Sequence, residues 1–223
     1  DPETFNKAKY EAIDGFLSSI PPGLVLDVGS NAGRYSELAV NRGNRVVAID
    51  TDELTLQELY LNARTARLPI LPLKMDIMWP TGSHGLGLSR PPATDRLKAD
   101  TTLWLAVLHH LTGTQLFSYE AVARMIDAYT REVAIVEFIP KDDIHIREWP
   151  RVAESWWDVD HFIEAMRPYF GSVEVRPSIP DPRLMLCFKR TANSSSSKTS
   201  PNAEGEELIS GGRSGEDGEV LNL

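Results

Sequence analysis

The feature that most constrains the fold of this chain is a repeated alternation between short apolar segments and longer amphipathic ones. The short segments have the length and the flanking turn residues of buried strands, and the longer ones carry apolar residues at helical spacing. Strands connected through helices run parallel to one another. The alternation therefore predicts an α/β fold: a doubly wound, Rossmann-like sheet of about seven strands with helices on both faces.

The parallel part of the sheet is predicted to contain five strands, at residues 24–28, 45–49, 70–74, 102–108 and 133–138. Helices are expected at residues 2–19, 33–42, 52–66, 114–130 and 158–169. Two further apolar segments, 173–176 and 184–189, are separated by a proline-rich stretch that is too short for a helical crossover. The sheet is therefore expected to be mostly parallel and to finish in an antiparallel hairpin.

Residues 1–190 are predicted to form one domain, and residues 191–223 to form a disordered acidic tail. The tail is rich in Ser, Gly and Glu and has no aromatic residue, so it offers little apolar surface to bury. It contributes −4 to the formal net charge of −9, which leaves −5 for the domain.

The composition also argues against some partners and locations. A mildly acidic domain without a Lys/Arg cluster lacks the charge that nucleic-acid binding usually requires. No apolar run approaches the roughly 20 residues that span a bilayer, and no signal-peptide pattern is present, so we expect a cytoplasmic protein without a membrane partner. The chain starts at Asp1 rather than at methionine, which leaves room for residues upstream. Cys187, in an apolar run, is expected to be a buried structural thiol.

The most informative segment is residues 25–36, Val-Leu-Asp-Val-Gly-Ser-Asn-Ala-Gly-Arg-Tyr-Ser, which combines a buried strand, a glycine-containing turn and the start of a helix. Such a turn lets the backbone approach a nucleotide at the carboxyl end of the strand. A dinucleotide fingerprint requires glycine at the first, third and sixth positions. Counting from Gly29, the third position is Asn31 and the sixth is Arg34, which disfavours NAD.

The segment instead resembles the first motif of the class I S-adenosylmethionine-dependent methyltransferases. That motif is an acidic residue, one residue, glycine, three residues and glycine, and here it corresponds to Asp27, Gly29 and Gly33. The resemblance covers residues 24–138 and implies S-adenosylmethionine as the cofactor, with Asn31 also in the cofactor-binding turn.

Two acidic residues at later strand ends fit the same cofactor. Asp50 ends the second strand, 21 residues after Gly29, where a carboxylate can accept hydrogen bonds from both ribose hydroxyls. The family resemblance implies that Asp76, after the third strand, binds the exocyclic amine of adenine and that Ile77 packs beside the ring. Taken singly, each carboxylate could equally be a helix cap.

His109 and His110 are the candidate catalytic residues on the acceptor side. They follow the fourth strand, which neighbours the first strand across the topological switch point, where ligands bind in such folds. Methyl transfer to a hydroxyl needs a group that removes its proton, and histidine suits that role. We prefer His109 as the base; capping or packing is the alternative for either histidine.

Glu137, near the end of the fifth strand, is the third candidate. A carboxylate in an apolar strand is costly to bury alone, so we expect it to have a partner. It could orient a histidine, hold the acceptor or be structural. The nearby Asp142 and Asp143 fit a turn as well as a cation site, and we assign no metal.

The ends of the fourth and fifth strands also resemble a bacterial subgroup of these enzymes that includes nodulation-associated methyltransferases. The segments concerned are residues 106–111, Ala-Val-Leu-His-His-Leu, and 136–143, Val-Glu-Phe-Ile-Pro-Lys-Asp-Asp. The resemblance implies a small-molecule or glycan acceptor, and the available base favours transfer to oxygen. Two alternatives remain: an NAD(P)-dependent oxidoreductase, and a non-catalytic partner that binds S-adenosylmethionine.

Two segments outside these motifs could shape an acceptor pocket. Residues 79–97 form a long Gly- and Pro-rich insertion, which is expected to be a lid or a binding loop; disorder or a surface excursion is the alternative. Residues 149–157 contain three tryptophans, which we expect to pack in the core or at an interface rather than to stack on a ligand.

Overall fold

A computed structural model of the chain describes residues 2–149 and 154–191. Nearly all of the predicted acidic tail, from residue 192 onward, lies outside the described residues, so its predicted disorder remains a prediction. Among the described residues, no helix has the length and apolar character needed to cross a lipid bilayer.

The described residues build a seven-stranded sheet in the order β3-β2-β1-β4-β5-β7-β6. Strands β1 to β5 are mutually parallel, whereas β7 is antiparallel to both β5 and β6. The predicted mostly parallel sheet with an antiparallel C-terminal hairpin is therefore confirmed. The chain order reverses between β1 and β4, which is the switch point at which ligands bind in this architecture. The strands are β1 (Leu24–Val28), β2 (Arg45–Asp50), β3 (Ile70–Lys74), β4 (Ala99–Trp104), β5 (Thr130–Phe138), β6 (Ser172–Pro177) and β7 (Leu184–Lys189).

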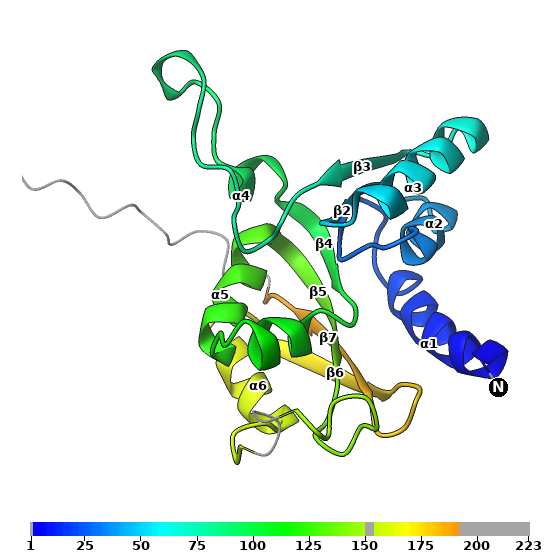
Figure 1. Cartoon of the computed structure of the whole chain (residues 1–223), viewed down its shortest axis with the longest axis vertical. Coiled ribbons are helices and arrows are strands. Elements are labelled where there is room, and N and C mark those ends of the chain that lie inside the picture. The colour runs from blue at the N-terminus through cyan, green and yellow to red at the C-terminus, as the bar shows by residue number, and fades with distance from the viewer. Residues whose placement is uncertain (1, 150–153, 192–223) are drawn as a thin grey trace, which may run out of the picture. The chain divides into compact units, whose positions relative to one another are not determined.

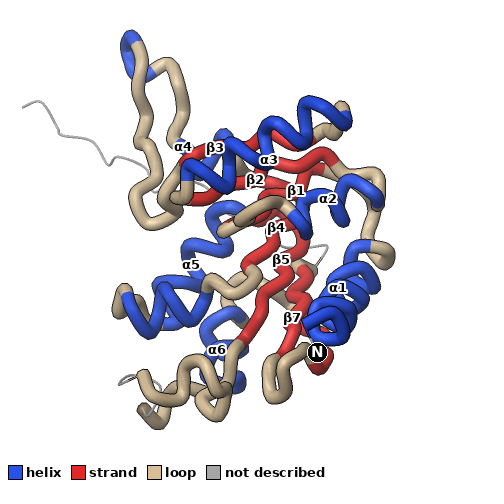
Figure 2. Tube along the Cα trace, turned by 45° about the vertical axis from the view of Figure 1, so that its right-hand side comes forward, coloured by secondary structure: helices blue, strands red, loops and turns tan. Residues whose placement is uncertain are grey.

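Helices cover both faces of the sheet, and Figure 2 shows α1 and α2 on one side and α5 and α6 on the other. Alternation along β5 explains the two layers: Ile135 packs in the core cluster with α1, α2 and α3, and Val136 packs in the cluster with α5 and α6. The helices are α1 (Pro2–Leu17), α2 (Arg34–Asn41), α3 (Glu53–Ala66), α4 (Ala93–Arg96), α5 (Tyr119–Tyr129) and α6 (Val159–Met166); two short turns are η1 (Leu86–Leu88) and η2 (His110–Thr114).

The predicted end of the fourth strand is wrong: β4 stops at Trp104, and residues 105–108 are not part of the sheet. The backbone turns at Ala106, whose φ of 56° is incompatible with a continuing strand. Leu105 and Leu108 are nevertheless buried, in opposite core clusters. Their apolar character reflects this burial and does not signal strand pairing. The following helix also starts later than expected, after one turn of π-helix at η2 and a cap at Ser118.

The insertion at residues 79–97 ends in α4, and the loop before α4 extends away from the sheet (Figure 1). It contains η1 and a single bridge between His84 and Arg90. Its apolar side chains are largely uncovered, with Trp79 79% and Leu86 97% exposed. In the structure this insertion is a surface excursion, which is one of the alternatives given by the sequence, and it does not form a closed lid.

Candidate active site

The turn between β1 and α2 is bound to the end of β2. The backbone N–H groups of Gly29 and Ser30 both donate to the carbonyl oxygen of Ile49, at 2.9 and 3.0 Å. The N–H of Asn31 donates to Oδ2 of Asp50 at 2.8 Å. The predicted turn and the predicted carboxylate thus meet at the carboxyl ends of two neighbouring parallel strands.

Both glycines of this turn are required by the backbone. Gly29 has a φ of 69°, and an added Cβ would lie 2.8 Å from Cγ2 of Val107 in the segment after β4. Gly33 has a φ of 81°, and an added Cβ would lie 2.3 Å from Cδ1 of Leu59 in α3. The first glycine therefore lets residues 105–108 approach the turn, and the second lets α3 pack against the start of α2.

Replacement of Gly33 by alanine is expected to lower the free energy of unfolding by about 1–3 kcal/mol, because it strains the backbone and meets Leu59. Urea denaturation followed by circular dichroism measures the change. Gly82→Ala is the matched control: nothing lies within 4 Å of the added Cβ, so its change should stay within about 0.5 kcal/mol. Equal effects of the two variants would contradict the assigned role of Gly33.

Asp27 lies beneath the turn and is 1% exposed. The hydroxyl of Ser36, in the first turn of α2, donates to its Oδ2 at 2.7 Å. Burial raises the pKa of Asp27 to about 6, and the hydrogen bond from Ser36 only partly opposes this effect. Sequence reasoning missed Ser36; the available signal was a polar residue on the buried side of α2.

Asp50 is the last residue of β2 and Asp76 lies two residues after β3, so both are at the same edge of the sheet. Oδ1 of Asp50 accepts the backbone N–H groups of Thr51 and Asp52, at 2.7 and 3.0 Å. Together with Asn31, these donors use three of the roughly four acceptor positions of the carboxylate. The Asp76 carboxylate accepts the N–H of Met78 at 2.9 Å.

Ile77 is 8% exposed and belongs to the core cluster that also contains Leu26 and Ile49. The strand order β3-β2-β1 puts Asp76, Asp50 and the Gly29 turn in sequence along the edge.

The two histidines share an aromatic cluster with Trp149. The ring centroids of His109 and His110 are 4.1 Å apart, and each lies within 5.7 Å of the Trp149 ring. His109 is 8% exposed, and its Nδ1 is buried without a hydrogen-bond partner among the described residues. Burial, with the adjacent His110 next in importance, lowers the pKa of His109 to about 3. His110 is the more exposed of the two histidines, and the part of its ring that is buried is enough to lower its pKa as well.

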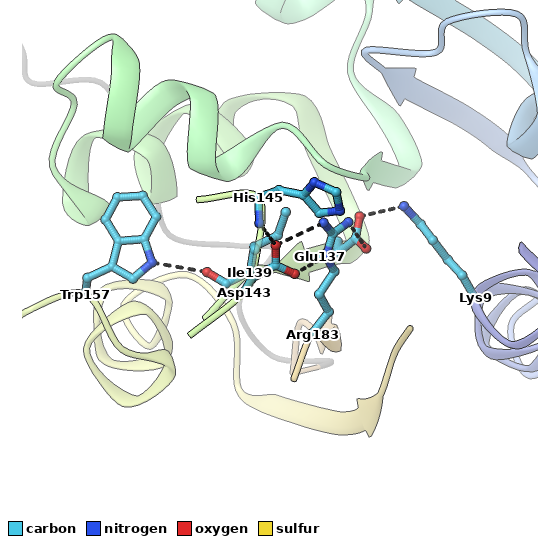
Figure 3. A network of polar contacts seen from close by, with 7 residues as sticks. All are labelled: Lys9, Glu137, Ile139, Asp143, His145, Trp157 and Arg183. Carbon is cyan, nitrogen blue, oxygen red and sulfur yellow. Dashed lines mark hydrogen bonds and ion pairs between the residues drawn. The ribbon is translucent and has the colours of Figure 1, made fainter. Parts of the chain in front are cut away.

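Glu137 does have partners, as expected, but they are cations and not a histidine. Its side chain is fully buried, and Oε2 lies 2.6 Å from Nζ of Lys9 in α1. Nη1 of Arg183 lies 3.8 Å from Oε1, which makes no hydrogen bond with the described residues. Figure 3 shows Lys9 reaching Glu137 from one side and Arg183 lying against it from the other.

Arg183 continues this network to Asp143, which is also fully buried. Its Nε donates to Oδ2 of Asp143 at 2.7 Å, and the N–H of His145 donates to Oδ1 at 2.9 Å. Burial alone would raise the pKa of Asp143, but these hydrogen bonds outweigh it and hold the pKa below its ordinary value. Asp142 is exposed, so the two adjacent aspartates do not act as a pair.

Of the three tryptophans after β5, Trp157 is buried, whereas Trp149 and Trp156 are half-buried and pack against the same core cluster. Trp157 is 2% exposed and donates to the carbonyl oxygen of Ile139 at 3.1 Å (Figure 3). Trp156 and Tyr119 line a cavity of about 600 Å³ between α5 and α6. No residue of the Gly29–Gly33 turn lines this cavity, so it is separate from the candidate cofactor site.

No family model matches the chain. It is 29% identical over 147 residues to the nodulation protein NoeA of Rhizobium meliloti (strain 1021), an alignment that covers 64% of this chain and 30% of that protein. The chain therefore spans less than a third of the length of this curated relative.

Solved structures resemble the chain over most of its length. The methyltransferase domain of bacterial CtHen1-C aligns with a TM-score of 0.60 and 18% identity, covering 84% of this chain and all of that domain. Magnesium protoporphyrin IX methyltransferase (ChlM) from Synechocystis PCC 6803, crystallised with bound SAM, aligns with a TM-score of 0.59 and 16% identity, over 86% of this chain and 82% of that one. Sequence identities this low establish the fold and nothing finer. The chain has the fold of the class I S-adenosylmethionine-dependent methyltransferases, as its first motif predicts.

Proposed function

We propose that this protein is an S-adenosylmethionine-dependent methyltransferase that acts on a small-molecule or glycan acceptor, at oxygen. The observation that carries the proposal is the glycine turn of β1, closed onto Asp50 and adjacent to Asp76 at the ends of three neighbouring strands. The ChlM structure, which resembles the chain, contains bound SAM and supports the same cofactor here.

The residues at this edge fit the proposed cofactor. Ser30 Oγ is buried in the turn without a partner among the described residues, and Gly29 leaves no room for a side chain there. Asp50 would accept a hydrogen bond from one ribose hydroxyl with its remaining acceptor position, and Asp76 would accept from the adenine amine while Ile77 packs beside the ring. Bound at this edge, the cofactor supplies an electrophilic methyl group on a sulfonium.

The acceptor side is proposed to lie over His109 and His110, which follow the segment that contacts Gly29. Transfer forms an oxygen–carbon bond as the sulfur–carbon bond breaks, and the hydroxyl proton must leave to a base. Both histidines remain candidates. The exposure of His110 supports it as the proton acceptor, whereas a pKa of about 3 supports a positioning role for the neutral His109 ring.

Glu137 is proposed to act from beneath this site. It is fully buried between Lys9 and Arg183, so we assign it the task of holding these two cations, and not direct contact with the acceptor. The acidic net charge of the domain supports a small-molecule or glycan acceptor over a nucleic acid.

The first test is calorimetric titration with S-adenosylhomocysteine. Wild-type protein should bind it. Asp50→Ala should lose detectable binding, because the same carboxylate accepts the N–H of Asn31 in the turn and would accept a hydrogen bond from the ribose. Glu53→Ala is the matched control: it removes a nearby carboxylate that is 73% exposed and paired with Lys74, and it should bind like wild type. Absence of wild-type binding, or tighter binding of NADH in a parallel titration, would refute the proposed function.

A further inference from the structure

Lys9 is an unusually enclosed lysine, with a side chain only 12% exposed. It comes from α1, which contains none of the motif residues of the proposed site. Its amine lies 2.6 Å from Glu137 at the end of β5 and 5.3 Å from the centroid of the Tyr35 ring in α2. One cation from α1 thus contacts both the helix that starts at the cofactor turn and the strand that leads to the acceptor side.

The rest of α1 repeats this bridging arrangement. On the α2 side, Arg34 lies over the ring of Tyr10 at 5.9 Å, and Asp14 pairs with Arg42. On the opposite side, the guanidinium of Arg176 in β6 lies 4.1 Å from the centroid of the Phe16 ring. The helix therefore spans from α2 to β6, and Lys9 is the point at which it reaches buried charge.

The charge of Lys9 acts on both halves of the proposed site. The pKa of Asp27 is raised mainly by burial, and the positive charge of Lys9 works against that rise. The pKa of His109 is lowered mainly by burial, and Lys9 adds to that lowering. The same amine thus favours the charged form of a cofactor-side group and the neutral form of an acceptor-side group.

We propose that Lys9 is a positioning residue that fixes α1 across the start of α2 and Glu137, and so couples occupancy of the cofactor turn to the acceptor side. The inference rests on the proposed methyltransferase function. Without this bridge, a ligand at the turn no longer stabilises α1, and the affinity falls by the coupling free energy that the bridge supplied. A coupling of this kind typically changes binding by fivefold or more.

The test uses a variant that removes the bridge without leaving a buried charge unpaired. Lys9→Met alone would leave the buried Glu137 carboxylate with only Arg183, at 3.8 Å, and so destabilise the fold. Lys9→Met/Glu137→Gln removes both charges of the closer pair, which is often neutral for stability. Lys7→Met is the matched control, because Lys7 lies on the same helix with a side chain 75% exposed. Each protein is titrated with S-adenosylhomocysteine, and hydrogen exchange of residues 7–17 is measured with and without that ligand.

We expect the ligand to slow exchange in α1 of the wild type and of Lys7→Met. The double variant should keep a wild-type thermal midpoint to within a few degrees, bind at least fivefold more weakly and show no ligand-dependent protection of α1. Wild-type affinity and protection in the double variant would overturn the role of Lys9 while leaving the proposed function intact. Failure of the wild type to bind would instead refute the proposed function itself, and the inference with it.

Discussion

Replacement of Arg183 by methionine is expected to lower the free energy of unfolding by about 3–5 kcal/mol, the usual cost of removing one partner from a buried ion pair. Methionine keeps much of the length of the side chain but carries no charge. Asp143, which is fully buried, would retain only the N–H of His145 as a hydrogen-bond donor among the described residues. Glu137 would at the same time lose one of its two cations.

Guanidinium denaturation at pH 7 measures this loss. Arg167→Met serves as the control, since Arg167 is 69% exposed and pairs with Glu164 three residues earlier in α6, an interaction worth less than about 1 kcal/mol. The double variant Arg183→Met/Asp143→Asn should regain part of the stability, because it no longer buries an unpaired carboxylate. A single-variant loss no larger than that of Arg167→Met would show that the Arg183 network does not stabilise the fold.

This network could not have been predicted from the sequence. Lys9 and Glu137 are 128 positions apart, and Arg183 and Asp143 are 40 apart, so no local pattern pairs them. Sequence reasoning required only that Glu137 have a partner, because an unpaired carboxylate in a strand is too costly. Identifying the partner needs the crossing of α1 over the sheet and the antiparallel pairing of β7 with β5.

The sheet could be predicted because its signals are local. Strands β1 and β3 are apolar runs bounded by glycine, proline or charged residues, and both have the bounds that the sequence predicts. The end of β4 was misplaced because residues 105–108 are apolar for another reason. They lie against the Gly29 turn and in both core layers after the strand has stopped.

The placement of Asp50 beside the turn could also be foreseen, since the carboxyl ends of adjacent parallel strands share one edge of the sheet. The environments of the two histidines could not be predicted from the sequence. Their sequence neighbours do not reveal that His109 is enclosed and that His110 is exposed, because that difference depends on the π-helical turn of η2 and on Trp149.

Replacement of Asp27 by asparagine is expected to raise the stability of the unliganded protein by about 3 kcal/mol at pH 7. The folded-state pKa of about 6, against an ordinary value of 3.8, means that ionised Asp27 destabilises the fold by that order of magnitude. Asparagine has nearly the same shape, carries no charge and can still accept the hydrogen bond from Ser36.

The pH dependence identifies the cause of this gain. A carboxyl group with a raised pKa keeps its proton in the folded state between about pH 4 and pH 6, where the unfolded chain has lost it, so its penalty shrinks as the pH falls. The gain from Asp27→Asn should therefore drop to about half at pH 5, as measured by urea denaturation of both proteins at each pH. Asp142→Asn, at an exposed position, should show no such trend. A gain that is equal at the two pH values would mean that Asp27 is not the titrating group.

A buried carboxylate that lowers stability persists in a fold when it has another task, and the proposed function supplies one. Asp27 lies beneath the cofactor turn, where its charge would favour the ammonium group of the cofactor. Asp27→Asn should accordingly bind S-adenosylhomocysteine about tenfold more weakly at pH 7, a loss of about 1.4 kcal/mol, although the protein itself is more stable. Wild-type affinity should also weaken as the pH falls through about 6, while that of the variant stays level across the same range. If Asp27→Asn were more stable than the wild type but bound S-adenosylhomocysteine with unchanged affinity, Asp27 would have no role in cofactor binding.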